Sequence, residues 1–462
     1  MKKDKQHSKE LTEGSEFPVT VKRLGINGEG VGFFKRKAVF VPGALPGEVI
    51  VCKAVKVSTK HILAKVKKIR QSSPERINAP CPVYEKCGGC QLQHLSYQGQ
   101  LLGKKDMVVQ AFERYAKKHR VYIKDTIGME EPWYYRNKSQ WQVRSEHGTT
   151  KAGLFAMNSN KLVDLTGPGC MVEEPLLNKI SKTVIEIAKE LRLPVHHQNK
   201  NKQGLRTIAA RISTAAATAQ LTIITSSPEL PEKLTLVKRI RERLPEVVSI
   251  FHNVQPTSSS VIFGKKTRHL WGETTIKESL KEQSFNLSPH AFFQLNPRQA
   301  EVLYEEARIA ADLDGTQKVI DAYCGTGTIG LWMAGKAKEI RGMDTIASAV
   351  NDANENAAAH GYLHAKFYNG RAEEIIPRWS QQGWNAEVII VDPPRTGCAN
   401  SLLKTIVKTK PKKFIYVSCN PSTLAKDADF LLNNGFELTY IQPVDMFPQT
   451  AQTEAVAKFV LK

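Results

Sequence analysis

The chain has 462 residues, with 66 Lys and Arg against 45 Asp and Glu and a formal net charge of +21. One hydrophobic core rarely organises this length, so we expect two or three domains, and the basic balance points to a polyanionic partner such as nucleic acid. The Lys-rich start leads into no apolar segment, and nowhere do about 18 apolar residues run together. We therefore expect a cytoplasmic protein without a membrane span.

Short strand-like runs separated by glycine and proline turns fill the stretch from Phe17 to Arg70. This spacing predicts a small, OB-like antiparallel barrel. This stretch contains twelve Lys and Arg residues but only two acidic residues, Glu29 and Glu48. Such a concentration favours binding to a nucleic-acid backbone, although a solvated basic face is the alternative. We assign residues 1–74 to the barrel, including a basic N-terminal tail that we expect to be disordered.

The middle of the chain mixes helical and strand patterns without an obvious repeat. We assign residues 75–285 to a central α+β domain. Helices are expected at Gln100–Lys117 and Glu174–Leu191, and the first of them could pack on a neighbouring domain.

Four cysteines in this middle region have the spacing of a metal site. Cys81, Cys87 and Cys90 are clustered, and Cys170 follows in a turn-rich segment. Four thiolates hold either a zinc ion or a [4Fe–4S] cluster. Zinc sites usually pair two short-spaced knuckles, so three clustered ligands and one remote ligand favour the cluster; zinc and plain buried thiols stay open. A fourth ligand leaves no iron exposed, which predicts a structural or RNA-orienting role.

The last region, residues 286–462, alternates helices with strand-turn-helix units. This pattern predicts a doubly wound parallel sheet. Strands are expected at 318–320, 388–391 and 414–417, and the ends of parallel strands converge on one ligand crevice. The sequence therefore places three strand ends around a single pocket.

A glycine-rich loop, 321–330, follows the first of these strands and opens a helix. Asp344 ends the next strand, where a carboxylate can accept hydrogen bonds from ribose hydroxyls. The loop lacks the third glycine of a dinucleotide fingerprint and begins with an acid that would repel a pyrophosphate. S-adenosylmethionine, cationic and free of phosphate, fits this loop better than NAD.

The other two strand ends carry reactive or polar groups. Cys419 follows 414–417 in the tetrad Ser-Cys-Asn-Pro, so a buried strand presents an unpaired thiol to the pocket and makes it a candidate nucleophile. Asp392-Pro393-Pro394 follows 388–391 and resembles the turn by which many methyltransferases present a polar group beside the methyl donor.

Three segments, 392–397, 416–423 and 445–450 followed by Glu454, closely resemble the RNA uracil-5-methyltransferases. The N-terminal barrel resembles their TRAM domain, and the four clustered and remote cysteines match the cluster ligands of the ribosomal RNA branch. The resemblance implies a Rossmann-like class I methyltransferase domain at 286–462. It also implies methylation of C5 of specific uridines in 23S ribosomal RNA by a monomer, with the two-site enzymes of Gram-positive bacteria as the nearest type.

The resemblance also assigns roles to single residues. Cys419 would be the nucleophile, which adds to uracil C6, and Glu454 would be the base that removes the C5 proton. The cluster ligands would be Cys81, Cys87, Cys90 and Cys170. The contacts to S-adenosylmethionine would come from Gln294, Tyr323, Asp344 and Asp392. The family often has a histidine where this chain has Gln452.

Three other functions are compatible with parts of the sequence. A tRNA uracil-5-methyltransferase would use the same catalytic residues. An iron–sulfur oxidoreductase would explain the cysteines and the glycine loop but leaves Cys419 and the basic barrel unused. A non-catalytic RNA-binding or ribosome-assembly factor would keep the fold without the reaction.

Overall fold

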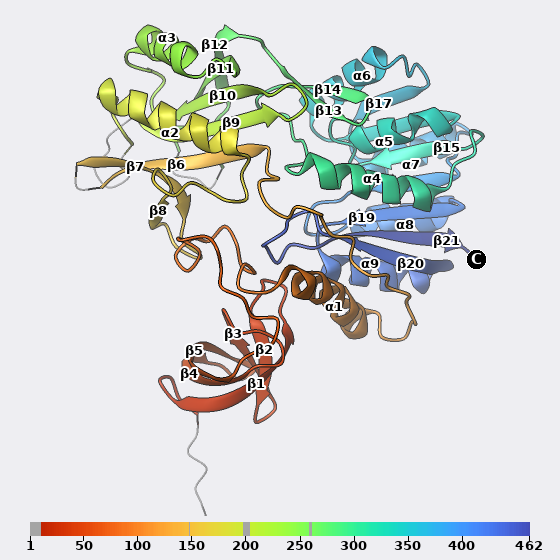
Figure 1. The fold of residues 1–462 in the computed structure, drawn as a ribbon. Coiled ribbons are helices and arrows are strands. Elements are labelled where there is room, and N and C mark those ends of the chain that lie inside the picture. The colour runs from red at the N-terminus through yellow and green to blue at the C-terminus, as the bar shows by residue number, and fades with distance from the viewer. Residues whose placement is uncertain (1–10, 147, 197–203, 258–260) are drawn as a thin grey trace, which may run out of the picture.

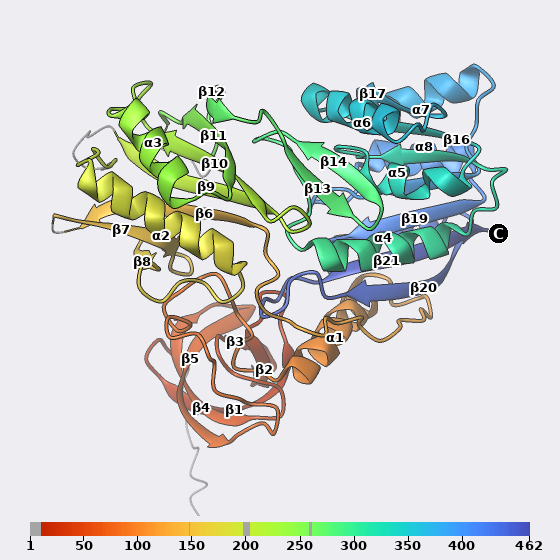
Figure 2. The same ribbon diagram turned by 45° about the horizontal axis from the view of Figure 1, so that its top comes forward.

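The structure is a computed structural model that describes residues 11–146, 148–196, 204–257 and 261–462. The tail at 1–10, predicted to be disordered, lies outside the described residues. Figure 1 shows three parts: a barrel at one end, a central sheet, and a second large sheet that carries the C-terminus. Helix α1 (Tyr97–Tyr115) lies between the barrel and the second sheet in both ribbon views (Figure 2).

The N-terminal part is a closed barrel of five strands in the order β1-β2-β3-β5-β4, which confirms the predicted barrel. The prediction that it is antiparallel is wrong for one pairing, because β3 and β5 run parallel. Side chains in β1 alternate between exposed and buried, so Phe17, Val19 and Val21 fill the interior with Ile50 and Ile62. The strands are β1 (Glu16–Leu24), β2 (Gly30–Phe34), β3 (Lys37–Val41), β4 (Val49–Val57) and β5 (His61–Gln71).

The central part is a seven-stranded sheet in the order β12-β11-β10-β9-β6-β7-β8. Helices α2 (Pro175–Glu190) and α3 (Lys233–Arg243) cover one face, where Trp141 and Ile208 are fully buried against them. The strands are β6 (Lys138–Glu146), β7 (Thr149–Phe155), β8 (Leu162–Asp164), β9 (Leu205–Ser213), β10 (Thr218–Thr225), β11 (Val247–Val254) and β12 (Lys266–Gly272).

The C-terminal part has the Rossmann-like architecture that the alternating pattern predicted. Its seven strands run in the order β17-β16-β15-β18-β19-β21-β20, and only the pairings made by β21 are antiparallel. The strands are β15 (Lys318–Ala322), β16 (Glu339–Asp344), β17 (Ala365–Asn369), β18 (Val388–Val391), β19 (Lys413–Ser418), β20 (Phe436–Val444) and β21 (Glu454–Leu461). The helices are α4 (Pro297–Ala311), α5 (Thr328–Met333), the short 3-10 helix η2 (Ala334–Lys336), α6 (Ala347–Ala359), α7 (Ala372–Gln381), α8 (Asn400–Thr409) and α9 (Pro421–Leu432).

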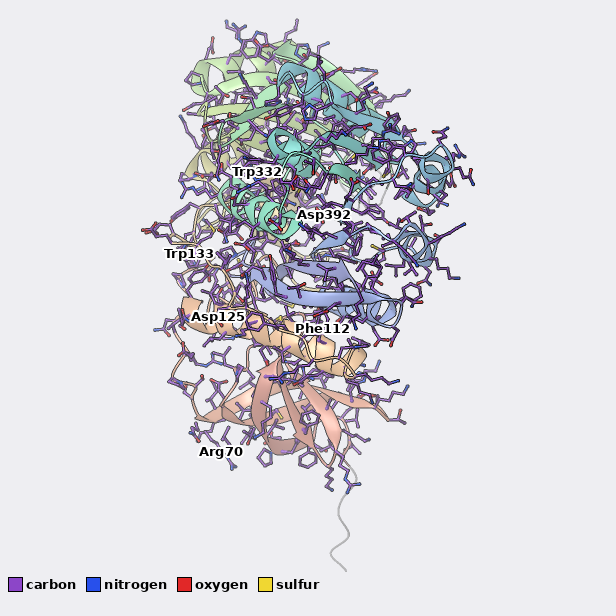
Figure 3. All side chains as sticks on the ribbon, turned by 90° about the vertical axis from the view of Figure 1, so that its right-hand side faces the viewer. Arg70, Phe112, Asp125, Trp133, Trp332 and Asp392 are labelled. Carbon is purple, nitrogen blue, oxygen red and sulfur yellow. The ribbon has the colours of Figure 1, made fainter. Side chains whose placement is uncertain are left out.

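Two elements from the middle of the sequence pack on this C-terminal sheet. The hairpin of β13 (Ile276–Leu280) and β14 (Gln283–Leu287) buries its apolar side chains in the core above β15 and β16. Helix α1 buries Val108 and Phe112 against α9 and β20. Figure 3 shows Phe112 on α1 between Arg70 of the barrel and Asp392 of the C-terminal sheet. In the described part of the chain, no helix is long and apolar enough to span a membrane.

At Gly342, the backbone of β16 lies very close to the ring of Phe367. A Cβ atom at Gly342 would lie 2.2 Å from Cδ1 of Phe367, whose ring is buried. We predict that Gly342→Ala lowers the free energy of unfolding by about 1–3 kcal/mol, because the ring has no room to move away. Thermal and denaturant unfolding will measure the change. Gly335→Ala is the matched control, since a Cβ there meets nothing within 4 Å; equal stability of the two variants would contradict the prediction.

Candidate active site

Strand ends bring Asp392, Cys419 and Glu454 to one edge of the C-terminal sheet. Asp392 follows β18, Cys419 follows β19, and Glu454 opens β21. Ser418 pairs with Ala455 in the antiparallel β19–β21 ladder. The next positions outward are Cys419 and Glu454, so the ladder itself sets the thiol beside the carboxyl group.

Hydrogen bonds at the start of α9 fix the loop that carries Cys419. The Asn420 side chain accepts a hydrogen bond from the Ser422 N–H (3.0 Å) and donates one to the Arg395 carbonyl (2.8 Å). Pro421 occupies the first turn of the helix, where its missing N–H costs nothing. The turn after Asp392 and the turn around Cys419 are thereby tied together.

The Cys419 thiol is half-buried. Burial raises its pKa to about 11, with further contributions from Glu454 and Asp392, while Arg395 acts in the opposite direction. The thiol is therefore protonated at rest near neutral pH.

The Glu454 carboxyl group is buried beside other acids. Burial and Asp392 raise its pKa well above the ordinary value, and Arg395 and Lys104 oppose that rise. Burial also raises the pKa of Asp392 to about 7. A protein region with several poorly solvated carboxyl groups and one thiol is typical of a site for proton transfer.

An open cleft of about 640 Å³ lies beside this edge of the sheet. Tyr323 and Asp344 line it, together with the 396–400 turn and the side chains of Lys426 and Phe430. Tyr323 adopts a left-handed backbone conformation (φ +63°), which is rare for a non-glycine residue. Asp344 accepts hydrogen bonds from the N–H groups of Gly325 (3.1 Å) and Ile346 (2.9 Å). The cleft thus has an ordered polar wall at the end of β16.

Gln294 and Asp392 do not line this cleft, although the sequence grouped them with Tyr323 and Asp344. Gln294 is buried within hydrogen-bonding reach of the Tyr304 hydroxyl. Burial raises the pKa of that hydroxyl, and the charges of Asp392 and Asp321 add to the rise. Asp321 is also buried, and burial raises its pKa to about 7. The structure therefore divides the four predicted cofactor residues into a pair that lines the cleft and a pair that lies outside it near the Tyr304 hydroxyl.

The four cysteines of the predicted cluster line one small pocket of about 20 Å³, to which Leu154 of β7 in the central sheet also contributes. Burial raises the pKa of Cys90 to about 11 and also raises the pKa values of Cys87 and Cys170. The Gly89 N–H donates to Cys87 Sγ at 3.4 Å. A Cβ at Gly88 would lie 2.8 Å from the Met157 backbone nitrogen, so the loop between these ligands requires its small residues.

The donor chemistry of this pocket fits an iron–sulfur cluster. Four thiols surround one hollow, and a backbone N–H points at one of the sulfurs. Within the described residues, however, no three His, Cys, Asp or Glu side chains are grouped closely enough to hold a single metal ion. By ligand type, four thiols suit either a zinc ion or a [4Fe–4S] cluster.

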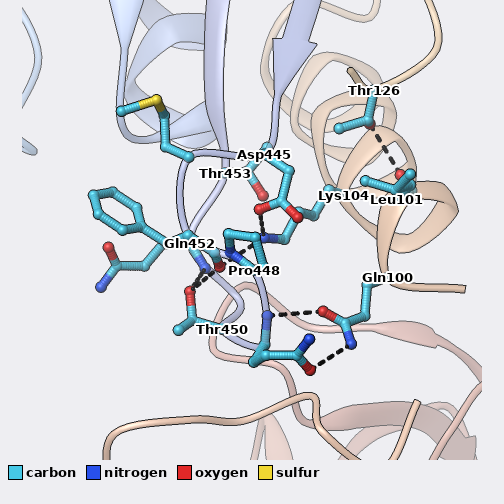
Figure 4. Close-up of polar contacts among 12 residues, drawn as sticks. Gln100, Leu101, Lys104, Thr126, Asp445, Pro448, Thr450, Gln452 and Thr453 are labelled. Atoms are coloured by element: carbon cyan, nitrogen blue, oxygen red, sulfur yellow. Dashed lines mark hydrogen bonds and ion pairs between the residues drawn. The ribbon is translucent and has the colours of Figure 1, made fainter. Parts of the chain in front are cut away.

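Sequence reasoning missed the charged residues that surround Glu454. Lys104 of α1 forms an ion pair with Asp445, which follows β20, and both side chains are fully buried (Figure 4). Arg395 lies in the exposed turn after Asp392. Arg395 and Asp445 lie in two of the segments that carry the family resemblance, but their charges were given no role, and Lys104 lies within the helix predicted at 100–117. By contrast, Gln452, at the position where the family often has histidine, is exposed to solvent.

Comparison with known proteins agrees with this architecture. Residues 264–459 match the tRNA (Uracil-5-)-methyltransferase family and residues 10–67 match the TRAM domain. The uncharacterized RNA methyltransferases of Bacillus anthracis and Halalkalibacterium halodurans are each 51% identical to this chain, over 99% and 97% of both sequences respectively.

Among solved structures, the Pyrococcus abyssi tRNA (uracil-54, C5)-methyltransferase in complex with S-adenosyl-L-homocysteine is 26% identical, with a TM-score of 0.77. The match covers 96% of this chain and 100% of that one. Barrel, central part and C-terminal sheet are thus shared as a whole. The chain belongs to the RNA uracil-5-methyltransferase family and carries its TRAM domain at the N-terminus.

Proposed function

We propose that this protein uses S-adenosylmethionine to methylate C5 of specific uridines in 23S ribosomal RNA, with Cys419 as nucleophile and Glu454 as base. The observation that carries the proposal is the β19–β21 register, which sets a thiol and a buried carboxyl group side by side. A reaction that adds a thiolate to one ring carbon and removes a proton from the next needs this pair of groups.

The residues of the open cleft fit the adenosine part of S-adenosylmethionine. Asp344 lies at the end of β16 and lines the cleft, where its carboxylate could accept from ribose hydroxyls. Tyr323 lines the same cleft. Gln294 and Asp392 lie outside it near the Tyr304 hydroxyl and would contact the methionine end. When bound, the cofactor supplies an electrophilic methyl group.

Cys419 makes uracil C5 reactive by adding to the ring. Uracil C5 is a poor nucleophile, but a thiolate that bonds to C6 moves an electron pair into the ring and gives C5 carbanion character. C5 then attacks the methyl group. Because burial raises the pKa of the thiol to about 11, the thiolate forms in the complex with RNA and not in the resting enzyme.

Glu454 completes the reaction by removing the C5 proton. The electrons of the C5–H bond restore the C5–C6 double bond, the S–C6 bond breaks, and the thiolate leaves. The base must lie within reach of C5 while sulfur is still bound to C6. The position of Glu454 next to Cys419, one step beyond the Ser418–Ala455 pair, supports this assignment.

The barrel supplies a surface for the RNA. Its β2–β3 hairpin turns at Lys35 and Arg36, both with positive φ (45° and 67°), and places these cations at an exposed tip beside the exposed ring of Phe33. Cations and an exposed aromatic ring together suit single-stranded nucleic acid, because the cations pair with phosphates and the ring stacks on an unpaired base. The target uridine must be unstacked to reach Cys419, which favours a loop.

One observation favours ribosomal RNA over transfer RNA as the substrate. The four-cysteine pocket resembles a feature of the ribosomal branch of the family, whereas the barrel is shared with the Pyrococcus abyssi tRNA enzyme. The transfer RNA alternative has its own support, because the Pyrococcus abyssi structure with a TM-score of 0.77 is that of a tRNA methyltransferase. A direct map of the modified nucleotide separates the two.

The pocket lined by Cys81, Cys87, Cys90 and Cys170 is proposed to hold a [4Fe–4S] cluster with a structural role. All four positions are occupied by protein ligands, so no iron is left open for a substrate. The cluster would join the segment around Cys90 to the segment around Cys170, which come from distant parts of the central region.

We predict that Glu454→Gln stops the reaction after methyl transfer. The amide cannot take the C5 proton, so a covalent protein–RNA adduct that carries the methyl group should accumulate and product release should slow by about 10²–10⁴-fold. Denaturing gel electrophoresis with radiolabelled methyl donor measures both. Cys419→Ala is the control, which should give neither adduct nor product; turnover by Cys419→Ala would exclude the covalent route.

We predict that Cys90→Ser removes iron and acid-labile sulfide from protein purified without oxygen and lowers its unfolding temperature. Loss of one thiolate opens the cluster, while Cys52→Ala, inside the barrel, should leave the metal content unchanged. Iron and sulfide analysis provides the measurement. If the wild-type protein contains zinc and no sulfide, the pocket is a zinc site and not an iron–sulfur site. If it contains neither iron nor zinc, the four cysteines are buried thiols without a metal.

We predict that cells lacking this protein lose 5-methyluridine from 23S ribosomal RNA. Nuclease digestion and mass spectrometry of ribosomal and transfer RNA will locate the lost methyl groups and show whether one or two uridines are modified. Wild-type protein should restore them and Cys419→Ala should not. If 5-methyluridine is lost from transfer RNA alone, the assignment of ribosomal RNA as substrate is wrong, but the proposed methylation of uracil C5 still holds.

A further inference from the structure

The four-cysteine pocket has a cation in its wall. Arg136 lines this pocket together with the four cysteines, and among the described residues of the wall it alone carries a positive charge. The rest of the lining is apolar or neutral. An arginine seldom lies in such surroundings unless an anion or several hydrogen-bond acceptors satisfy it. The position of Arg136 therefore requires a partner.

The backbone fixes Arg136 beside the segment that follows Cys170. Its N–H donates to the Val172 carbonyl (2.9 Å), and its carbonyl accepts from the Glu174 N–H (3.0 Å). These bonds form a short parallel bridge that pairs Arg136 with Glu173. Paired residues of neighbouring strands direct their side chains to the same face. Cys170 lies near that face, because burial and then the charge of Glu173 raise the pKa of its thiol.

The most buried nitrogen of Arg136 has no protein partner. Within the described residues, Nε is buried and no hydrogen-bond acceptor lies within its reach. Glu173 is engaged elsewhere, since both of its oxygens accept from the Trp141 indole N–H, at 3.3 and 3.0 Å. An unsatisfied donor on a buried charged group costs more free energy than an ordinary lost hydrogen bond. An anion in the pocket would remove this cost.

A metal bound by the four cysteines is such an anion. The cysteines bind a metal as thiolates, and a zinc ion and an iron–sulfur core each supply only about two positive charges against four negative ones. In both cases the bound group keeps a net charge of about −2. A buried charge of this size is stable only where cations and N–H donors face it.

The other donors near the sulfurs are neutral. The Gly89 N–H donates to Cys87 Sγ at 3.4 Å, and the Gln93 side chain lies within hydrogen-bonding reach of Cys90. Charge-assisted hydrogen bonds are about twice as strong as neutral ones. Burial raises the pKa of the Cys90 thiol to about 11, and the charge of Arg136 opposes that rise. The guanidinium therefore favours the thiolate form that a metal requires.

We propose that Arg136 is the counter-cation of the metal group bound by the four cysteines, and that its guanidinium stabilises the thiolates by charge and by hydrogen bonding. The inference rests on the metal centre of the proposed function and adds to it a residue that is not a ligand. Arg136 takes no part in the methylation step.

The test compares Arg136→Met with Arg144→Met in full-length protein purified without oxygen, before and after a chelator has removed the metal. Arg144 is a half-buried arginine of β6 that donates to the Val143 carbonyl (2.7 Å) and does not line the pocket. Arg136→Met should lower the unfolding temperature of the metal-loaded protein and leave that of the stripped protein unchanged, because the anion is present only in the first. Arg144→Met should affect both forms alike.

Loss of Arg136 should also speed the loss of metal. We expect Arg136→Met to release its metal to EDTA about ten- to hundredfold faster than the wild type, which is the effect of one hydrogen bond to a charged group. Arg144→Met should keep the wild-type rate. A zinc site shows this faster release and no reduction.

An iron–sulfur cluster offers a further measurement. Reduction adds an electron to a group that is already negative, so removal of a nearby cation makes it less favourable. In a dithionite titration, the ratio of reduced to oxidised cluster in Arg136→Met should fall about tenfold or more at a fixed potential, a shift of about −59 mV. An unshifted potential would contradict the proposal.

Two further results would overturn the proposal. One is an equal fall in unfolding temperature with and without metal, which would assign Arg136 to the fold alone, and the other is metal loss no faster than in Arg144→Met. Should Arg136→Met fail to fold, Arg136→Gln and Arg144→Gln replace the pair under the same criteria. Wild-type protein without iron or zinc would remove the metal site and this inference together. Absence of 5-methyluridine would contradict the proposed methylation and leave the role of Arg136 standing.

Discussion

The antiparallel position of β21 between β19 and β20 is the constraint on which the site depends. In a purely parallel sheet, the reactive groups at one edge all come from strand ends. Here β21 runs in reverse, so its first residue, Glu454, lies at the same edge as Cys419 at the end of β19. One ladder of backbone hydrogen bonds therefore sets the separation of the proposed nucleophile and the proposed base, which a pair of flexible loops could not hold as firmly.

This arrangement puts several acids in a poorly solvated region. Burial raises the pKa values of Asp321 and Asp392 to about 7 and raises that of Glu454 as well. A carboxylate that is buried near other acids has a raised pKa and tends to be protonated, so it cannot accept a proton unless nearby cations lower its pKa. Arg395 and Lys104 are those cations. The site is thus built from opposing electrostatic effects, and its working pH depends on their balance.

Local patterns in the sequence were sufficient for the barrel, the parallel strands and the residues at their ends. Cys419 and Asp392 follow short apolar runs, and a strand end is a local feature. The pair Lys104–Asp445 is separated by 341 residues, and nothing local couples them. The packing of the β13–β14 hairpin on the C-terminal core was equally hidden, because its apolar residues suit any core. Long-range contacts of this kind follow from the assembled fold alone.

The loop between β20 and β21 connects the active site to the cysteine pocket. Immediately after Cys90, the N–H groups of Gln91 and Leu92 both donate to the Gln449 carbonyl at 3.0 Å. Gln449 is buried and has a positive φ of 70°, a conformation that its surroundings must enforce. Those surroundings are the residues after Cys90 on one side and Gln100 of α1 on the other. Whatever orders the cysteine segment therefore also orders the loop that begins at Asp445 and ends at Glu454, so a group bound by the cysteines would influence the position of the proposed base.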